Sequence, residues 1–413
     1  MTKSRSSVML EREYSRTSQT GISLHCHTKY SKEFLDFVPY YAKMYPVVSS
    51  LFRMGCRRFE KTNGRPPNFN LGHWEPPLDA HQLIASESSS LVSLDLTPIV
   101  SITDHDSIQA GLDLELGDSR HPISMEWTVP FGEAYFHVGV HNLPPGEADE
   151  VSRILLEYTS SPGRSKGREL NEIFSLLNQS REVLIVLNHP SWDIEMIGQQ
   201  RHDDALRSFT RTYGHYFHAI ELNGFRPWAE NQIAIRLAEE LDLPIVSGGD
   251  RHCLHHNSMI NITNAETFSE FVEEVRVDKQ SQVLILPEYS KSLLHRQISS
   301  ISQILGEFSD FPESRRKWSQ RIYFDWQDGR GLRSLATRWS RHEPVQYRLA
   351  IRIMDLLGVS WLENLWCMVD PATDLDALNE SLMTTSRSLT DQTVEISRTN
   401  HSQFFTPPID SVS

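Results

Sequence analysis

Short apolar runs rich in β-branched residues recur between residues 22 and 252, and most of them end in a histidine or an asparagine. Runs of this length with polar boundaries are typical of buried strands. The pattern predicts seven strands, over 22–27, 98–105, 123–129, 135–141, 183–189, 218–223 and 244–252.

Helical periodicity occupies several of the intervals between these strands. It predicts helices over 79–94, 167–179 and 228–241, the last with apolar residues on one face and acids on the other. Strands that alternate with helices favour mostly parallel pairing, in which the carboxyl ends of the strands share one edge. We therefore expect an α/β fold whose sheet closes into a barrel.

Two regions interrupt this alternation. Residues 28–78 contain proline, glycine and aromatic residues, and we interpret them as an insertion that packs over a strand end as a candidate lid. Residues 288–380 contain helix-like segments such as 346–357 and carry no assigned chemistry. The predicted domains are a polar tail at 1–20, a barrel at 21–287, a helical region at 288–380 and a disordered tail at 381–413.

The net charge and the apolar content of the chain limit the classes of partner that we expect. The chain has 413 residues and a formal net charge of -14, which argues against capture of duplex nucleic acid or of an anionic membrane. No apolar run reaches the ~18 residues of a membrane span, and the first twenty residues lack a secretory signal, so we expect a cytoplasmic protein. Its four cysteines are far apart, which argues against a disulfide framework or a zinc ribbon.

Histidines and carboxylates at strand ends are the candidate chemistry. His25 and His27 stand two residues apart on a strand, so both imidazoles share a face and can hold one ion. The spacing alone is weak evidence, because roughly 0.8 such pairs are expected by chance at this histidine content. Glu126 lies inside an apolar run, where a carboxylate is costly unless it is paired or binds a cation.

In chain order, the segments HCHT, ITDHDS, MEW, FHVG, NHP, ELN and GGDRH resemble the successive motifs of the polymerase and histidinol phosphatase (PHP) superfamily. The resemblance covers about 21–253, interrupted by the insertion at 28–78. It implies a distorted (β/α)7 barrel of PHP type, with an insertion after strand 1 and a helical C-terminal extension. It also implies a metal-dependent phosphoesterase with two or three divalent ions.

The resemblance implies three sets of ligands, with Glu126 bridging the first two ions. They are His25, His27 and Asp250; Glu126, His137 and His189; and His105 with His252. So many ligands exceed the four that one tetrahedral zinc accepts, and imidazole with carboxylate suits Zn, Mn and Fe alike. We expect a metal-bound water to be the nucleophile and Asp104 to orient a ligand histidine.

The chain departs from the family pattern after the first motif. It reads Tyr30-Ser31-Lys32-Glu33, so Glu33 or Asp36 must complete the third ion, or that ion is weak or absent. His141 lies four residues beyond His137 on the same strand face and is the alternative ligand if the register differs.

A second departure is Arg251, where the family typically has a small residue. Its guanidinium could grip phosphate in a bidentate manner, and Lys29 and Arg226 are further candidate substrate contacts. Two roles stay open for Glu221 and Asn223. Each could hold a metal ligand in place through a hydrogen bond, or could serve only in the turn at the end of its strand.

The sequence therefore predicts hydrolysis of a phosphoester bond in a small phosphorylated metabolite or short nucleotide, by metal-activated water. Two alternatives stay open. One is a multinuclear metal hydrolase that cleaves a non-phosphate bond, and the other is a non-catalytic PHP-like scaffold or binding protein. The oligomeric state is not predicted.

Overall fold

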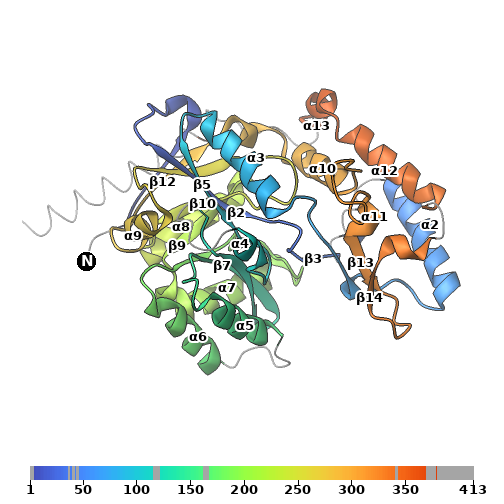
Figure 1. Cartoon of the computed structure of the whole chain (residues 1–413), viewed down its shortest axis with the longest axis horizontal. Coiled ribbons are helices and arrows are strands. Elements are labelled where there is room, and N and C mark those ends of the chain that lie inside the picture. Colours follow the sequence, from blue (N-terminus) through green and yellow to red (C-terminus); the bar gives the residue numbers. More distant parts are fainter. Residues whose placement is uncertain are drawn as a thin grey trace, which may run out of the picture.

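The computed structural model describes residues 4–35, 38–39, 42, 46–114, 121–160, 167–339, 343–368 and 378. Within these residues the chain is a mixed α/β protein with three sheets (Figure 1). The predicted disordered tail at 381–413 and the candidate ligand Asp36 lie outside the described residues.

The first sheet contains the strand of the histidine pair and has the order β1-β12-β11-β2-β5. Its strands are β1 (Arg5–Leu10), β2 (Thr20–Cys26), β5 (Thr97–Ile102), β11 (Met259–Thr263) and β12 (Gln280–Ile285). Strands β2 and β5 are parallel, whereas β11 runs antiparallel to both of its neighbours. Because β1 pairs with β12, residues 5–10 belong to this sheet and not to a polar tail.

The second sheet has the order β10-β9-β8-β7-β6. Its strands are β6 (Met125–Phe131), β7 (Ala134–His141), β8 (Leu184–Leu187), β9 (Ala219–Asn223) and β10 (Ile245–Gly248). Strands β8, β9 and β10 are parallel, but β7 is antiparallel to β6 and to β8. Only Gly132 and Glu133 connect β6 to β7, too few for the crossover that parallel pairing needs. The expectation of mostly parallel pairing fails here.

All seven predicted strands are present, but they lie in two separate sheets, and no closed barrel is found in the described residues. Isolated parallel bridges connect the sheet ends, between Cys26 and Arg251 and between His105 and Glu126. These bridges bring the end of β2 beside the end of β10, and the end of β5 beside the start of β6. The predicted (β/α)7 barrel is thus not confirmed.

The three predicted helices are confirmed as α3 (Ala80–Val92), α6 (Gly167–Gln179) and α8 (Trp228–Leu241). A capping box between Asp79 and Gln82 starts α3, because each side chain satisfies a backbone amide of the first turn. The other helices of the main body are α4 (Gln109–Asp113), α5 (Ala148–Thr159), α7 (Gln199–Tyr213) and α9 (Phe268–Arg276).

An aromatic core fixes the orientation of β6. Trp127 and Met125 are fully buried among the helices that cover the second sheet, and the indole Nε1 of Trp127 donates to the Leu155 carbonyl at 3.1 Å. Side chains alternate along a strand, so Glu126 between them points to the opposite face.

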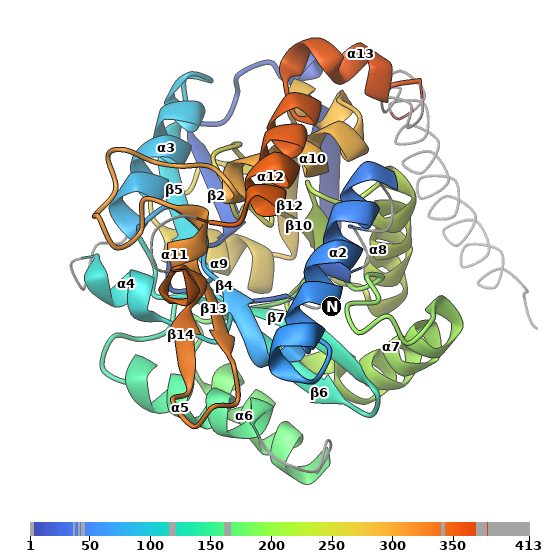
Figure 2. The ribbon, with the colours of Figure 1, turned by 90° about the vertical axis from the view of Figure 1, so that its right-hand side faces the viewer.

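The insertion and the C-terminal region together form a third sheet, which we call the accessory sheet. It contains β3 (Glu33–Phe34), β4 (Gly72–Trp74), β13 (Ile322–Asp325) and β14 (Leu332–Ser334), in the order β14-β13-β4-β3. Figure 1 shows it at the right of the view, with β3 leading back to the main body. Helices α2 (Pro46–Asn63) and α12 (Val345–Leu357) contact each other beside it (Figure 2).

The C-terminal region is therefore not wholly helical. It holds β13 and β14 as well as α12, which agrees with the predicted helix at 346–357. Its remaining helices are α10 (Leu293–Ile304), α11 (Trp318–Arg321) and α13 (Glu363–Trp366). None of the helices in the described part of the chain is long and apolar enough to cross a membrane.

Candidate metal centre

The end of β2 carries the histidine pair. The register of β2 against β5 is irregular between Ser23 and Cys26, and His25 lies in this bulge with φ of 63°. Such a backbone conformation is uncommon for a residue with a side chain, and a bulge re-aims the side chains around it. His25 and His27 thus meet at an irregular strand end, where the sequence analysis assumed a regular strand.

Two further candidate ligands also have positive φ, namely 50° at Asp250 and 25° at His189. Conformations of this kind collect at functional sites, where the surrounding packing holds them in place. Gly248 lies two residues before Asp250, and a Cβ atom at Gly248 would stand 1.9 Å from Oε1 of Glu221. The glycine is required because Glu221 approaches the backbone closely.

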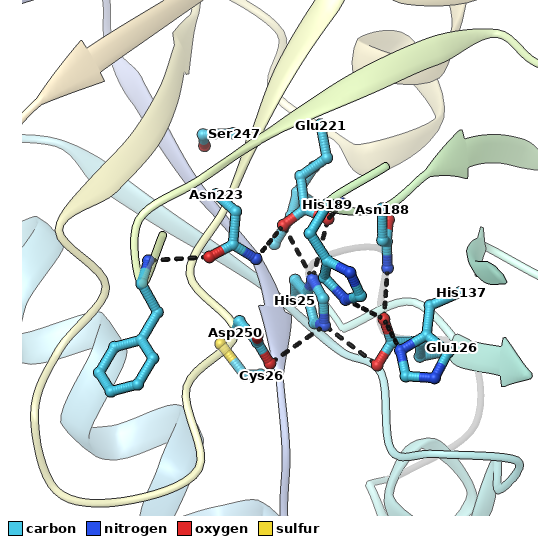
Figure 3. A network of polar contacts seen from close by, with 12 residues as sticks. His25, Cys26, Glu126, His137, Asn188, His189, Glu221, Asn223, Ser247 and Asp250 are labelled. Atoms are coloured by element: carbon cyan, nitrogen blue, oxygen red, sulfur yellow. Dashed lines mark hydrogen bonds and ion pairs between the residues drawn. The ribbon is translucent and has the colours of Figure 1, made fainter. Parts of the chain in front are cut away.

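Glu126 lies at the middle of the cluster and is fully buried (Figure 3). Its Oε2 is 3.1 Å from Nε2 of His25 and 3.1 Å from Nδ1 of His105. Its Oε1 is 3.2 Å from Nδ1 of His137 and 3.2 Å from Nε2 of His189. One carboxylate thus faces imidazoles from four different strands or strand ends.

Glu33 occupies the middle of the neighbouring group. Its Oε2 is 3.1 Å from Nε2 of His252 and 3.4 Å from Nε2 of His105, and its Oε1 is 3.8 Å from Nδ1 of His27. Strand β3 of the accessory sheet brings this acid to the centre. The insertion therefore supplies a candidate ligand, which a lid alone would not do.

Four overlapping groups of side chains have ligand atoms within 4.8 Å of one another, close enough to hold a metal ion. Every ligand that the PHP resemblance implied belongs to at least one of them, together with Glu33. The groups are His27, Glu33, His105 and His252; His25, Glu126 and His189; His25, His27 and Asp250; and His105, Glu126 and His137.

Several buried atoms of these candidate ligands lack a hydrogen-bond partner. They are Nε2 of His25, Nε2 of His27, Nδ1 of His105, Oε2 of Glu126 and both ring nitrogens of His137. Buried polar atoms are normally satisfied, and imidazole with carboxylate is a donor set that divalent transition metals accept. The residues present therefore fit divalent cations.

Contacts behind the ligands orient them. Glu221 Oε1 lies 2.9 Å from Nδ1 of His25, which leaves Nε2 to face the centre. Asn188 donates to Oε1 of Glu126 at 3.0 Å, and Asn223 donates to Glu221 at 3.0 Å (Figure 3). Such partners fix the tautomer and the ring orientation of a ligand. Glu221, which the sequence left open, thus supports a candidate ligand directly.

Burial and charge shift the pKa values in opposite directions. Burial would raise the pKa of Glu126, but the imidazoles around it, His25 first, hold it well below its usual range. Burial would lower the pKa of His105, yet Glu33 and Glu126 raise it to about 10. Burial lowers the pKa of His27 to about 3. A metal would displace protons from this cluster, since its ligands bind in their deprotonated form.

Asp104 supports the chain beyond the histidine pair. Its carboxylate accepts hydrogen bonds from the amide of Thr28 and, at 2.6 Å, from the Thr28 hydroxyl. Burial raises the pKa of Asp104 to about 7, against the effect of these bonds. The expectation that Asp104 orients a histidine ring is corrected, because these bonds hold the backbone that follows His27.

The guanidinium of Arg251 is bonded to other groups of the protein and does not face a substrate site. Its Nη1 is 2.5 Å from Oε1 of Glu87, its Nε donates to the Cys253 carbonyl at 2.8 Å, and its Nη2 donates to the Ser86 hydroxyl at 2.9 Å. The side chain is buried. The predicted phosphate contact is wrong for this residue, because internal partners occupy the guanidinium.

The other two predicted substrate contacts lie beside the centre. Arg226 lines a small pocket together with His189, but two of its nitrogens are each 2.8 Å from a carboxylate oxygen of Glu230. The ammonium of Lys29 lies 4.9 Å from the ring centre of Tyr30. Their role toward a substrate stays a prediction.

The alternative ligand His141 has a different environment from His137. Its Nδ1 lies 2.8 Å from the Ser101 hydroxyl, and burial lowers its pKa to about 3. It belongs to none of the four groups found among the described residues. His137 is therefore the candidate ligand on β7.

Two residues near the centre were missed by the sequence analysis. Glu87 is buried on α3 between Leu83 and Leu91, and an acid at four-residue spacing on an apolar helix face was the available signal. Trp74 on β4 is buried, with its ring centre 5.8 Å from that of His252. No local pattern connects residue 74 with residue 252.

No protein-family model and no curated protein matches the chain. Among solved structures, PsfC from Pseudomonas syringae is 15% identical, with 66% of this chain and 94% of that chain covered and a TM-score of 0.35. An amidohydrolase from Chromobacterium violaceum with bound sulfate and no metal is 13% identical, with coverages of 56% and 87% and a TM-score of 0.31. A proposed metal-dependent phosphoesterase from Bifidobacterium adolescentis is 11% identical, with coverages of 63% and 96% and a TM-score of 0.31. Similarity this weak carries no argument, so function must be argued from the site.

Proposed function

We propose that this chain is a metal-dependent phosphoesterase of PHP type, which holds two or three divalent cations (Zn, Mn or Fe) and hydrolyses a small phosphorylated metabolite or short nucleotide. The observation that carries the proposal is the set of buried imidazole and carboxylate atoms around Glu126 that have no hydrogen-bond partner and lie close enough to share a cation. The seven motifs in their order support a phosphoester as the bond that is cleaved.

Such cations, when bound, polarise a phosphoryl oxygen and make a water molecule more acidic. Glu126 would bridge two of them, one on the side of His25 and one on the side of His137. Glu221 keeps Nε2 of His25 directed to the centre, and Asn188 fixes the rotation of the Glu126 carboxylate. The protein thus holds its donors in place before any cation or substrate arrives.

A third cation would be held by Glu33 with His105 and His252, and Lys29 is our proposed contact to the substrate phosphate. The two isolated bridges between the sheets support a PHP-type ring of seven strands, because they connect β2 with the end of β10 and the end of β5 with β6.

The test measures metal content and phosphate release on the full chain. We expect more than one equivalent of a transition metal, and metal-dependent release of phosphate from phosphomonoesters or from bis-p-nitrophenyl phosphate with an added monoesterase. His25→Ala combined with His27→Ala should abolish both, whereas His81→Ala, at an exposed position of α3, should change neither.

Two results would contradict the proposal. Cleavage of amides or carboxylic esters without any cleavage of phosphoesters would favour a hydrolase of a non-phosphate bond. Less than one equivalent of metal, with no turnover after loading with Mn or Zn, would favour a non-catalytic protein.

A further inference from the structure

A buried ion pair lies directly behind the candidate metal centre. Arg251 Nη1 and Glu87 Oε1 are 2.5 Å apart, and the two side chains are 2% and 1% exposed. In the chain, Arg251 stands between the candidate ligands Asp250 and His252, whereas Glu87 comes from α3. Removing two charges from water is costly, so a pair in this place is weak evidence for stability alone.

The carboxylate of Glu87 contacts both segments that carry ligands. Its Oε2 accepts a hydrogen bond from the hydroxyl of Ser23 on β2 at 2.8 Å, and its Oε1 accepts one from the backbone amide of Asn257 at 3.2 Å. Asn257 donates through Nδ2 to the carbonyl of Leu24 at 3.1 Å. One side chain of α3 therefore joins β2, just before the histidine pair, to the chain that follows β10.

The backbone of Arg251 makes the second connection between the same segments. The amide of His27 donates to the Arg251 carbonyl at 2.8 Å, and the Arg251 amide donates to the His25 carbonyl at 3.3 Å. The guanidinium fixes this backbone through its bonds to Glu87 and to the Cys253 carbonyl. Side chain and backbone of one residue thus hold the two strand ends in register.

We propose that the Glu87–Arg251 pair is a positioning element of the metal centre, which holds the end of β2 and the loop after β10 at the separation that lets their side chains share a cation. The proposal rests on the proposed function. In the structure, Nε2 of His25 and Nε2 of His27 lie 3.6 Å and 3.5 Å from Oδ1 of Asp250. A functional centre must be held to within about 0.5 Å, so a small separation of the strand ends weakens cation binding.

The test uses four variants of the full chain. Arg251→Met removes the charge and keeps much of the side-chain volume, Glu87→Gln removes the opposite charge, and Arg251→Lys keeps the charge. The control is Arg276→Met, because the Arg276 guanidinium also donates to main-chain carbonyls, those of Val183 at 3.0 Å and Asn178 at 2.9 Å, away from β2 and β10.

Cation binding is measured by titrating Mn²⁺ into metal-free protein in a calorimeter, well below the melting temperature of each variant. We expect Arg251→Met and Glu87→Gln to bind about 10–100-fold more weakly than the unchanged chain. Arg251→Lys should recover part of this loss. Arg276→Met should lower the melting temperature and leave the Mn²⁺ affinity unchanged.

Hydrogen exchange in metal-free protein gives a readout that does not depend on the cation. The amides of His27 and Gly249 bond across the two strand ends, to the carbonyls of Arg251 and Leu24. Their exchange should accelerate at least about tenfold in Arg251→Met, through local opening, and not in Arg276→Met. If Arg251→Met is too unstable to purify, Glu87→Gln and Arg251→Lys carry the same readouts.

Unchanged exchange at both amides, together with Mn²⁺ affinity within twofold of the unchanged chain, would overturn the positioning role. If the unchanged chain binds no Mn²⁺ while these amides still respond to Arg251→Met, the metal-dependent function fails and the link between the strand ends stands. The two failures are therefore distinguishable.

Discussion

The two halves of the candidate centre are built differently. The inner half consists of Glu126 with His25, His137 and His189, all of them buried. The outer half consists of Glu33 with His27, His105 and His252, and the side chains of Glu33, His105 and His252 are 10%, 12% and 21% exposed. The acid of the inner half lies on β6, the last strand of the second sheet, whereas the acid of the outer half comes from the accessory sheet.

The difference between the two acids predicts that the inner half of the centre is the more rigid one. Glu126 lies on a seven-residue strand, and the residues on either side of it, Met125 and Trp127, are buried in the core. Glu33 lies on the two-residue strand β3, which pairs with β4. A ligand on a long, core-packed strand is better fixed than one on a short strand, so we expect the inner half to bind its cations more tightly.

The largest effect is expected for Glu126→Gln. A neutral amide cannot bridge two cations, so turnover should fall by at least about 10³-fold and the inner half should lose its metal. Metal analysis and steady-state kinetics measure both. Glu157→Gln, on an exposed position of α5, is the matched control and should behave as the unchanged chain. Retention of full metal content by Glu126→Gln would remove the basis for the inner half.

Glu33→Gln should have a smaller effect. The outer half loses its acid while Glu126, His25, His137 and His189 are untouched, so we expect loss of about one equivalent of metal and a fall in turnover of about 10–100-fold. If Glu33→Gln strips all metal, the two halves are one cooperative unit and the comparison between them is wrong.

Phe324→Ala tests the accessory sheet without changing a ligand. Phe324 is buried with Leu35 and Trp74 next to β3, so its loss should loosen the support of Glu33. We expect a change of about 0.5–2 kcal/mol in the affinity for the outermost cation and none for the inner ones. Competition with a chelating dye resolves the classes of site, and an equal loss at all sites would contradict a separate support for the outer half.

The smallest effect concerns His218, outside both halves. Its Nδ1 accepts from the Ile185 amide at 3.0 Å and its Nε2 lies 2.9 Å from Oδ1 of Asn178. Burial, and then Arg276, lowers the pKa of His218 to about 3, against about 6.5 when it is unfolded.

As the pH falls, His218 is therefore protonated in the unfolded chain before it is protonated in the folded one. The contribution of neutral His218 to the free energy of unfolding is complete above about pH 6.5 and is lost as the pH falls toward 3. The slope is at most about 1.4 kcal/mol per pH unit in this window. Urea unfolding of His218→Gln at pH 7, 6 and 5 should show a correspondingly flatter dependence than the unchanged chain. If the unfolding free energies of His218→Gln and of the unchanged chain vary with pH in the same way, His218 is not the cause of the pH dependence.

The sequence predicted the strands and most of the centre because those features are local. An apolar run that ends in a polar residue contains both the strand and its candidate ligand, which is why His105 and His189 could be named as candidates from the sequence. The fold brings both of them close to Glu126, and their role as ligands stays a prediction. The antiparallel turn at Gly132 was not predicted, because the alternation of strands with helices elsewhere favoured parallel pairing, whereas β6 and β7 are joined by two residues without a helix.

The errors share a different cause, which is contact between distant segments. Glu33 and Asp36 could not be separated, because strand pairing of the insertion with residues 322–325 brings Glu33 to the centre. Arg251 was assigned to the substrate because its partner Glu87 is 164 positions away and no local pattern connects the two. Residue type and spacing identify donors, but they do not tell which charges are already paired.

Strand β1 has a consequence for how this protein is made. Residues 5–10 pair with β12 at 280–285, so the ribosome must add some 270 residues before this early strand can find its neighbour. Until then its edge stays open to association with other chains, and pairing at such long range is slow. A translation arrest that exposes 5–10 without 280–285 should yield an aggregation-prone nascent chain, and chaperone demand during synthesis should be concentrated there.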